Sequence, residues 1–193
     1  MLKRLLCLQE DKSTGVDEMS SRLLKAVCHE ITVPVNLLFN LSMSECTVPN
    51  DWKLANITPI YKQGSRNSPE NYRPISLTCH LSKVMESIIR DVITQHLNKF
   101  DLINSSQHVF RRGRSFVTNL LAFLDKVASY RDDKESADII FLDFTKAFDK
   151  VPHSRLMSKI ISHGIDDRVA RWIGDWLGNR MQDATRLFKW CNV

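Results

Sequence analysis

An apolar run that leads into a carboxylate is the feature that most constrains this chain. Residues 139–142 (Ile-Ile-Phe-Leu) run directly into Asp143. Their β-branched and aromatic content is typical of a buried strand, which we predict over residues 137–144. An aspartate at the end of such a strand can be held beside Mg²⁺, and a carboxylate of this kind suits metal-assisted phosphoryl transfer. The alternative is an aspartate that only ends the strand and begins a turn.

The rest of the chain is predicted to be helix-rich, so the expected fold class is α+β. Extended segments are expected at 53–61 and 71–77, because Pro59 favours a sheet edge and Pro74 disfavours helix at the residue before it. Six helices are expected. The first three run from a cap at Asp17 or Ser20 to about Glu30, from a first turn that contains Pro34 through Leu41, and from Leu81 to Leu97. The last three run from Ser115 or Thr118 to Val127, from Pro152 to Gly164, and from Asp166 or Asp167 to Gly178. The positions expected to be buried in the first two helices are Leu23, Leu24, Val27, Leu37, Leu38 and Leu41. No linker interrupts this pattern, which indicates one continuous structural unit.

Composition narrows the class of protein. A chain of 193 residues can form one sizeable core, and only six glycines and six prolines argue against a fibrous or disordered chain. The five cysteines are scattered without a CxxC pair, so neither a zinc site nor a disulfide framework is indicated. We expect reduced thiols in an intracellular protein, in the nucleus or the cytoplasm, with no signal peptide or transmembrane segment.

The net charge of +5 is concentrated in one stretch of the chain. Residues 51–114 hold ten Lys/Arg against five Asp/Glu, and the remainder is balanced at seventeen of each. Such an excess indicates a surface that faces a polyanion. A solvated basic face without a partner is the alternative.

Six motifs follow one another in a recognisable order. They are KSTGVDE (12–18), WKLANITPIYKQG (52–64), NYRPISLT (71–78), SQHVFRRGRS (106–115), IIFLDFTKAFDKVPH (139–153) and RWIGDWLGNRMQ (171–182). In these motifs the chain closely resembles the reverse transcriptases of non-LTR, LINE-type retrotransposons of the jockey and chicken-repeat kind. The resemblance covers nearly the whole chain, from about Lys12 to Gln182.

The resemblance implies the fingers and the first part of the palm of a right-hand polymerase. Residues 1–15 would be a polar N-terminal segment, residues 16–182 the partial reverse transcriptase domain, and residues 183–193 a divergent tail. The family continues with a Gly-Val-Pro-Gln-Gly-Ser segment and a hairpin that carries two adjacent aspartates, whereas this sequence diverges after Gln182. The doublet Asp132-Asp133 lies before Asp143 in a charged turn and does not replace that pair. We therefore expect a domain truncated before these elements.

The resemblance also assigns roles at the catalytic centre. Asp143 corresponds to the first of the aspartates that hold two Mg²⁺ ions, and the backbone carbonyl of Phe144 would complete the shell of the second ion. Phe148 corresponds to the bulky gate that excludes a 2′-hydroxyl, although ordinary core packing is its alternative. Asp149 would orient the loop rather than bind metal.

Basic residues are assigned to the substrates by the same resemblance. Lys62 and Arg73 correspond to residues that hold the incoming triphosphate, the lysine as a point charge and the arginine as a planar fork. Arg111, Arg112 and Arg114 lie in a region that borders the template and could neutralise backbone phosphates. Val109 stands where the family has glycine, which would strain the loop if that position has positive φ.

The expected function is that of an RNA-directed DNA polymerase domain that is inactive alone, because one aspartate cannot hold two metals. Two alternatives stay open: a non-catalytic nucleic-acid-binding remnant, and a translated pseudogene without function. The implied partners are an RNA template, a DNA primer and deoxynucleoside triphosphates, with no membrane. The unpaired edge of the strand at 137–144 could also support oligomerisation.

Overall fold

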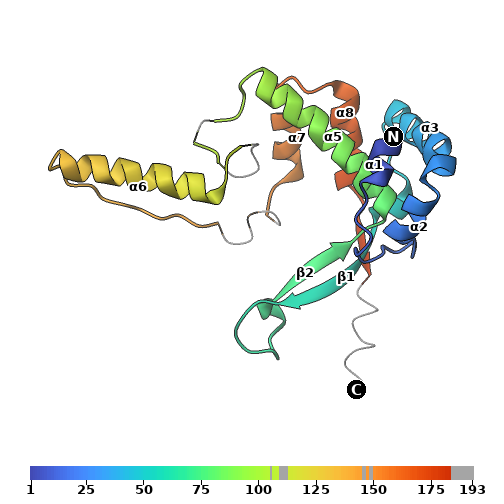
Figure 1. The fold of residues 1–193 in the computed structure, drawn as a ribbon, viewed down its shortest axis with the longest axis horizontal. Helices are drawn as coiled ribbons and strands as arrows, with labels where there is room; N and C mark the ends of the chain where they lie inside the picture. The colour runs from blue at the N-terminus through green and yellow to red at the C-terminus, as the bar shows by residue number, and fades with distance from the viewer. Residues whose placement is uncertain (105, 109–112, 145–146, 148–149, 184–193) are drawn as a thin grey trace. The chain divides into compact units, whose positions relative to one another are not determined.

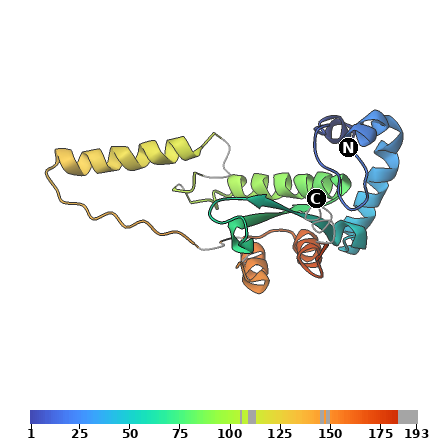
Figure 2. The same cartoon turned by 90° about the horizontal axis from the view of Figure 1, so that it is seen from below.

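The chain forms two compact units. The computed structural model describes residues 1–104, 106–108, 113–144, 147 and 150–183. The first unit combines Met1–Ile93 with His153–Val193, and the second unit is Thr94–Pro152; Figures 1 and 2 draw both. The sequence predicted one continuous structural unit, whereas the structure has two, and the described residues that form the core all belong to the first. The helix-rich character with a small mixed sheet agrees with the expected α+β class.

The first unit begins with helices, and some of their bounds differ from expectation. Its elements are α1 (Leu2–Leu6), α2 (Ser21–Ala26), α3 (Cys28–Glu45), α4 (Asn50–Lys53), β1 (Leu54–Tyr61), η1 (Pro69–Asn71), β2 (Tyr72–Leu77), α5 (His80–Lys99, which continues into the second unit), α7 (His153–Ser162), α8 (Asp167–Leu177) and β3 (Met181–Asp183). Ser20 caps α2 as predicted, by accepting a hydrogen bond from the backbone N–H of Leu23 at 3.2 Å. Among the described residues, every helix is too short or too polar to cross a membrane.

The buried face of α3 is not the predicted one. Pro34 lies inside this helix rather than in its first turn, at an exposed position where water can satisfy the carbonyl that loses its partner. Val35 and Phe39 face the core, whereas Leu37 is 63% exposed and Leu41 is 53% exposed. The helix is apolar on more than one side, so periodicity alone could not select the face that its neighbours cover.

A three-stranded sheet in the order β2-β1-β3 lies beside these helices. The strand predicted at 53–61 is confirmed as β1, which pairs antiparallel with β2, the segment predicted to be extended at 71–77. At its other edge β1 pairs in parallel with β3, through Leu54 opposite Met181 and Asn56 opposite Asp183. The tail predicted to begin at residue 183 therefore starts within a strand, and residues 184–193 lie outside the described part.

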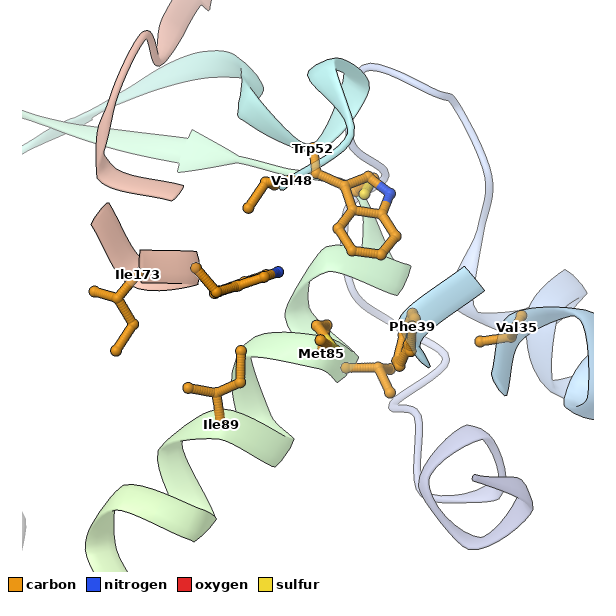
Figure 3. Close-up of a cluster of buried hydrophobic side chains, with 10 residues drawn as sticks. Val35, Phe39, Val48, Trp52, Met85, Ile89 and Ile173 are labelled. Carbon is orange, nitrogen blue, oxygen red and sulfur yellow. The ribbon is translucent and has the colours of Figure 1, made fainter. Parts of the chain in front are cut away.

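The core gathers side chains from α3, α4, α5 and α8 and from the short segments that precede α4 and α5. Its buried members are Val35, Phe39, Val48, Trp52, Cys79, Val84, Met85, Ile89, Trp172 and Ile173 (Figure 3). Phe39 meets Trp52 edge to face, with ring centres 5.5 Å apart. The helix predicted from Leu81 is confirmed as α5, and its buried positions 84, 85 and 89 have the expected spacing.

Helix α8 is tied to the opposite side of this core by polar contacts. The carboxylate of Asp175 accepts a hydrogen bond from the backbone N–H of Val48 at 2.7 Å and pairs with the ammonium of Lys53 at 2.8 Å. The indole N–H of Trp172 donates to the hydroxyl of Ser42 at 2.9 Å. Each contact joins segments more than 120 residues apart, so the first unit depends on both of its chain segments.

The second unit contains the long helix α6 (Phe116–Asp132), which Ser115 and Thr118 begin with a reciprocal capping box. This start confirms the predicted cap, but no residue of α6 is buried.

The buried strand predicted over 137–144 is wrong. Residues 135–144 have no regular secondary structure, and Phe141 and Leu142 are 82% and 87% exposed. A strand needs a neighbour to satisfy its backbone, and no described strand pairs with this segment.

Candidate nucleotide-binding site

Two predicted phosphate-binding residues lie on one face of the hairpin formed by β1 and β2. Arg73 is opposite Ile60 in the register. The backbone N–H of Lys62 donates to the carbonyl of Asn71 at 2.8 Å, which continues the ladder by one more pair. Because side chains alternate along strands, Lys62 and Arg73 face the same side as diagonal neighbours, with Cα atoms on the order of 7–8 Å apart. Both are exposed. The structure therefore brings these two residues together.

The opposite face of the hairpin carries two tyrosines that fix the connecting loop. The rings of Tyr61 and Tyr72 meet with their centres 5.6 Å apart. The hydroxyl of Tyr61 donates to the carbonyl of Gly64, and that of Tyr72 donates to the carbonyl of Arg66 at 2.9 Å. The guanidinium of Arg66 lies 5.3 Å from the centre of the Tyr61 ring. Loop residues 62–71 are thus anchored to the strands that precede and follow them.

Gly64 is required by the conformation of this loop. Its φ is +92°, and a Cβ there would lie 2.7 Å from the side-chain nitrogen of Asn71. That nitrogen donates to the carbonyl of Ser65 at 2.8 Å, which holds the amide in place. The loop is therefore held in one arrangement by side-chain contacts rather than by burial.

The hairpin offers positive charge beside apolar surface. Residues 62–73 contain the cations Lys62, Arg66 and Arg73 and one carboxylate, Glu70. On the face shared by Lys62 and Arg73, Ile60 and Ile75 are 49% and 42% exposed. Such a surface can hold phosphate oxygens next to a sugar or a base. Arg66, whose guanidinium lies over the Tyr61 ring, belongs to the other face of the hairpin and helps to anchor the loop rather than to form this surface.

Asp143 and Phe144 lie in the second unit, in the exposed segment without regular structure. The side chain of Asp143 is exposed, and its carboxylate forms no ion pair with another described residue. Within the described ranges, no group of three or more His, Cys, Asp or Glu side chains is placed to hold a metal ion. The metal-binding roles of Asp143 and of the Phe144 carbonyl therefore stay predictions. Phe148 and Asp149 lie outside the described residues.

The predicted template-binding arginines are only partly described. Arg114 is half-buried and directly precedes Ser115, the N-cap of α6. His108 also lies near this end of α6, with its ring Nδ1 3.1 Å from the hydroxyl of Thr118. Arg111, Arg112 and Val109 lie outside the described residues, so the role of the three arginines and the effect of valine remain predictions.

A doublet of aspartates after Asp143 belongs to a helix terminus. Asp166 accepts hydrogen bonds from the backbone N–H groups of Arg168 and Val169 at 3.0 and 3.4 Å, which confirms it as the cap of α8. Asp167 pairs with Arg171 at 2.9 Å, one turn further along the helix. This doublet therefore caps and pairs within a helix and is not a hairpin of metal ligands.

Comparison with known proteins identifies relatives of the chain. Residues 60–193 match the family described as reverse transcriptase (RNA-dependent DNA polymerase). The chain is 34% identical over 150 residues to a probable RNA-directed DNA polymerase from transposon BS of Drosophila melanogaster. It is 33% identical over 151 residues to the probable enzyme from transposon X-element of the same fly. It is 29% identical over 149 residues to the RNA-directed DNA polymerase from mobile element jockey, also of that fly.

These alignments cover 77%, 78% and 77% of the chain, but only 17%, 17% and 16% of the relatives. The chain thus spans about a sixth of the length of the curated relatives it matches. The family match includes the hairpin cations Lys62 and Arg73 and the segment around Asp143. The resemblance seen in the motifs is confirmed, and the chain belongs to the reverse transcriptase (RNA-dependent DNA polymerase) family, with relatives in non-LTR mobile elements.

Proposed function

We propose that the chain supplies the fingers and the first part of the palm of an RNA-directed DNA polymerase, and that the β1–β2 hairpin holds the triphosphate of the incoming deoxynucleotide. The observation that carries this proposal is the placement of Lys62 and Arg73 as diagonal neighbours on one exposed hairpin face. A triphosphate presents several anionic oxygens along a short chain. Two cations at this spacing can therefore contact neighbouring phosphates at once.

The anchored loop supports the proposal because it lowers the cost of binding. A flexible basic loop would lose conformational entropy when it ordered around a phosphate. Here the contacts of Tyr61, Tyr72 and Asn71 already fix loop residues 62–71. The apolar side chains of Ile60 and Ile75 extend the same face, where a deoxyribose or a base can pack.

Asp143 fits the role of a magnesium ligand in this proposal. Mg²⁺ in polymerase-type sites is bound by one or two carboxylates together with substrate phosphates and water, and the exposed carboxylate of Asp143 is a donor of this type. When bound, the metal would polarise a phosphoryl oxygen and neutralise charge on the phosphates. The carbonyl of Phe144 would be a second oxygen donor, and Phe148 would select against ribonucleotides by its bulk.

The proposed partners are an RNA template, a DNA primer and deoxynucleoside triphosphates. Arg111, Arg112 and Arg114 are proposed to meet template phosphates without regard to sequence, since neighbouring arginines can share one backbone. Support comes from the concentration of net positive charge in residues 51–114.

Binding of a deoxynucleoside triphosphate to the hairpin tests the proposal. Titration of dTTP with Mg²⁺ into the chain, followed by calorimetry, should give saturable binding. Arg73→Ala should weaken it by about 10- to 100-fold, because a charge-assisted hydrogen bond contributes about 1.5–3 kcal/mol.

Arg66→Ala is the matched control. It removes the same charge from the same loop, but the Arg66 guanidinium lies over Tyr61, whose side chain is on the other face of the hairpin. We expect less than about a threefold effect from this change, as for a screened charge. Equal losses in the two variants would show that only net charge matters, and absence of saturable binding would remove the hairpin from the proposed site.

A further inference from the structure

A basic cavity lies between α1 and the first half of α5, away from the hairpin residues. Its volume is about 640 Å³, the size of a pocket for one small molecule. The partly buried Met1 and Leu8 contribute apolar surface to it, and the cations Lys3, Arg4, Lys83 and Arg90 also line it. We refer to it as the α1–α5 cavity. No described carboxylate lines it, so its lining charge has a single sign.

The cations come from two distant parts of the sequence. Lys83, Ser87 and Arg90 recur at helical spacing on one stripe of α5, so they line the same side of that helix. Lys3 and Arg4 come from α1. Arg4 donates to the hydroxyl of Ser87 at 2.9 Å and to the carboxylate of Asp91 at 2.8 Å, which fixes α1 against α5. The fold thus adds two cations of the N-terminal segment to the basic stretch 51–114.

Asp91 holds two of the four cations in place without cancelling the others. One of its oxygens pairs with Arg4 at 2.8 Å and the other with Arg90 at 2.9 Å. Hydrogen bonds from Arg90 and Arg4 lower the pKa of this carboxyl below its usual value, so it stays ionised and keeps both guanidinium groups oriented. Lys3 and Lys83 form no ion pair with another described residue. Their ammonium groups can therefore take an anionic ligand without first losing a carboxylate.

We propose that the α1–α5 cavity binds a phosphate group that is joined to an apolar ring, as in one nucleotide unit. Lys3 and Lys83 hold the phosphate oxygens, and the ring packs on Met1 and Leu8. The unit can belong to a single strand or to a free nucleotide, because both present the same phosphate and ring. This inference goes beyond the proposed polymerase function, since it uses none of the hairpin residues.

Site-resolved labelling of lysines tests the inference on the full chain. The chain is acylated with an amine-reactive ester, alone and with a ten-residue oligo(dT), with dTMP or with inorganic phosphate, and modification of each lysine is measured by mass spectrometry. Both the oligonucleotide and dTMP should reduce labelling of Lys3 and Lys83 several-fold, whereas phosphate at the same concentration should have little effect. Protection by the oligonucleotide alone would assign the site to a strand, and protection by dTMP as well would assign it to nucleotides in general. If inorganic phosphate protected the two lysines as strongly as dTMP, the proposed packing of a ring in the cavity would be overturned.

A pair of double variants separates this site from general charge. Lys3→Ala/Lys83→Ala should reduce oligonucleotide affinity and flatten the dependence of log K on log salt by about 0.7, since both lysines hold one phosphate and each neutralised phosphate of a single strand contributes about 0.7. Lys12→Ala/Lys159→Ala removes the same charge from exposed positions that do not line the cavity, and it should leave the slope unchanged. Equal slopes in the two double variants would overturn the inference.

The two proposals fail in different ways in the labelling experiment. In a further arm with dTTP and Mg²⁺, labelling of Lys62 reports on the hairpin, whereas labelling of Lys3 and Lys83 in the arms with oligo(dT) or dTMP reports on the cavity. Protection of Lys62 without protection of Lys3 and Lys83 would remove the cavity and leave the hairpin proposal standing. Protection of Lys3 and Lys83 alone would support the cavity and count against the hairpin.

Discussion

Replacing Asp175 with alanine should destabilise the first unit by about 2–4 kcal/mol. The side chain of its partner Lys53 is only 8% exposed, so the substitution would leave a charge with little access to water. Breaking a fully buried ion pair costs about 3–5 kcal/mol, and a buried N–H left without an acceptor, here that of Val48, costs about 1–3 kcal/mol. The side chain of Asp175 is itself 34% exposed, so water can partly replace it, and the expected loss is smaller than the sum of these two costs.

Urea denaturation followed by tryptophan fluorescence measures this loss, because Trp52 and Trp172 lie in the core that α8 covers. With a denaturant slope of about 2 kcal/mol per molar, the midpoint should fall by about 1–2 M. Asp167→Ala is the control on the same helix. Its ion pair with Arg171 is exposed, with side chains 76% and 62% accessible, so the expected loss is below about 1 kcal/mol. Equal losses in the two variants would refute the reasoning.

The same contact gives the wild-type chain a dependence on acid. Burial alone would raise the pKa of Asp175, but hydrogen bonds from Lys53 and from the Val48 N–H, with the lysine charge, lower it below its usual value of 3.8. A carboxyl with a lowered folded-state pKa stabilises the fold at neutral pH, and this contribution is lost as pH falls below about 4. Asp175→Ala should therefore show a smaller loss of stability over that range than the wild type.

Two further predictions concern the contact between the N-terminal segment and the start of α5. Gly15→Ala should lower the free energy of unfolding by at least about 1–3 kcal/mol, because a Cβ at Gly15 would lie 2.6 Å from the backbone of Cys79. Gly174→Ala is the control: its Cβ would meet the flexible side chain of Met157 at 3.6 Å, so thermal melts should show a neutral or stabilising effect. Burial, and to a lesser extent the charge of Lys83, lowers the pKa of His80. The contribution of His80 to stability should therefore be full above about pH 6.5 and decline as pH falls below it. In urea titrations between about pH 5 and 7, His80→Gln should remove that decline.

Elements with one clear apolar stripe could be predicted from the sequence. The apolar spacing from Leu81 to Leu97 predicted α5, and Val84, Met85 and Ile89 of that stripe are buried, whereas Val92 is 51% exposed. Ser20, Ser115 and Asp166, each one of two predicted caps, do cap their helices. These signals are local, because each depends on residues within one or two turns.

Features decided by distant partners could not be predicted. The buried face of α3 is selected by contacts such as that of Ser42 with Trp172, which lies 130 residues away. The run at 139–142 has the composition of a strand, but composition does not supply the neighbouring strand that its backbone requires. For the candidate site, the motifs identified Lys62 and Arg73, whereas the meeting of Lys3 and Arg4 with α5 appeared only in the structure.

The way in which the first unit is closed has a consequence for how the chain folds during synthesis. Strand β1 pairs with β3, and the backbone N–H of Val48 donates to Asp175 in α8, so both lack these partners until the end of the unit has been synthesised. The hydrogen bond from Val48 to Asp175 spans 127 residues. At a translation rate of 5–20 residues per second, this separation corresponds to roughly 6–25 s. During that interval the side chains of Phe39 and Trp52 lack the cover of Trp172 and Ile173. Contacts of such high sequence separation also slow folding itself. Nascent chains stalled before residue 167 should therefore bind chaperones that recognise exposed apolar surface, and chains released beyond residue 183 should not.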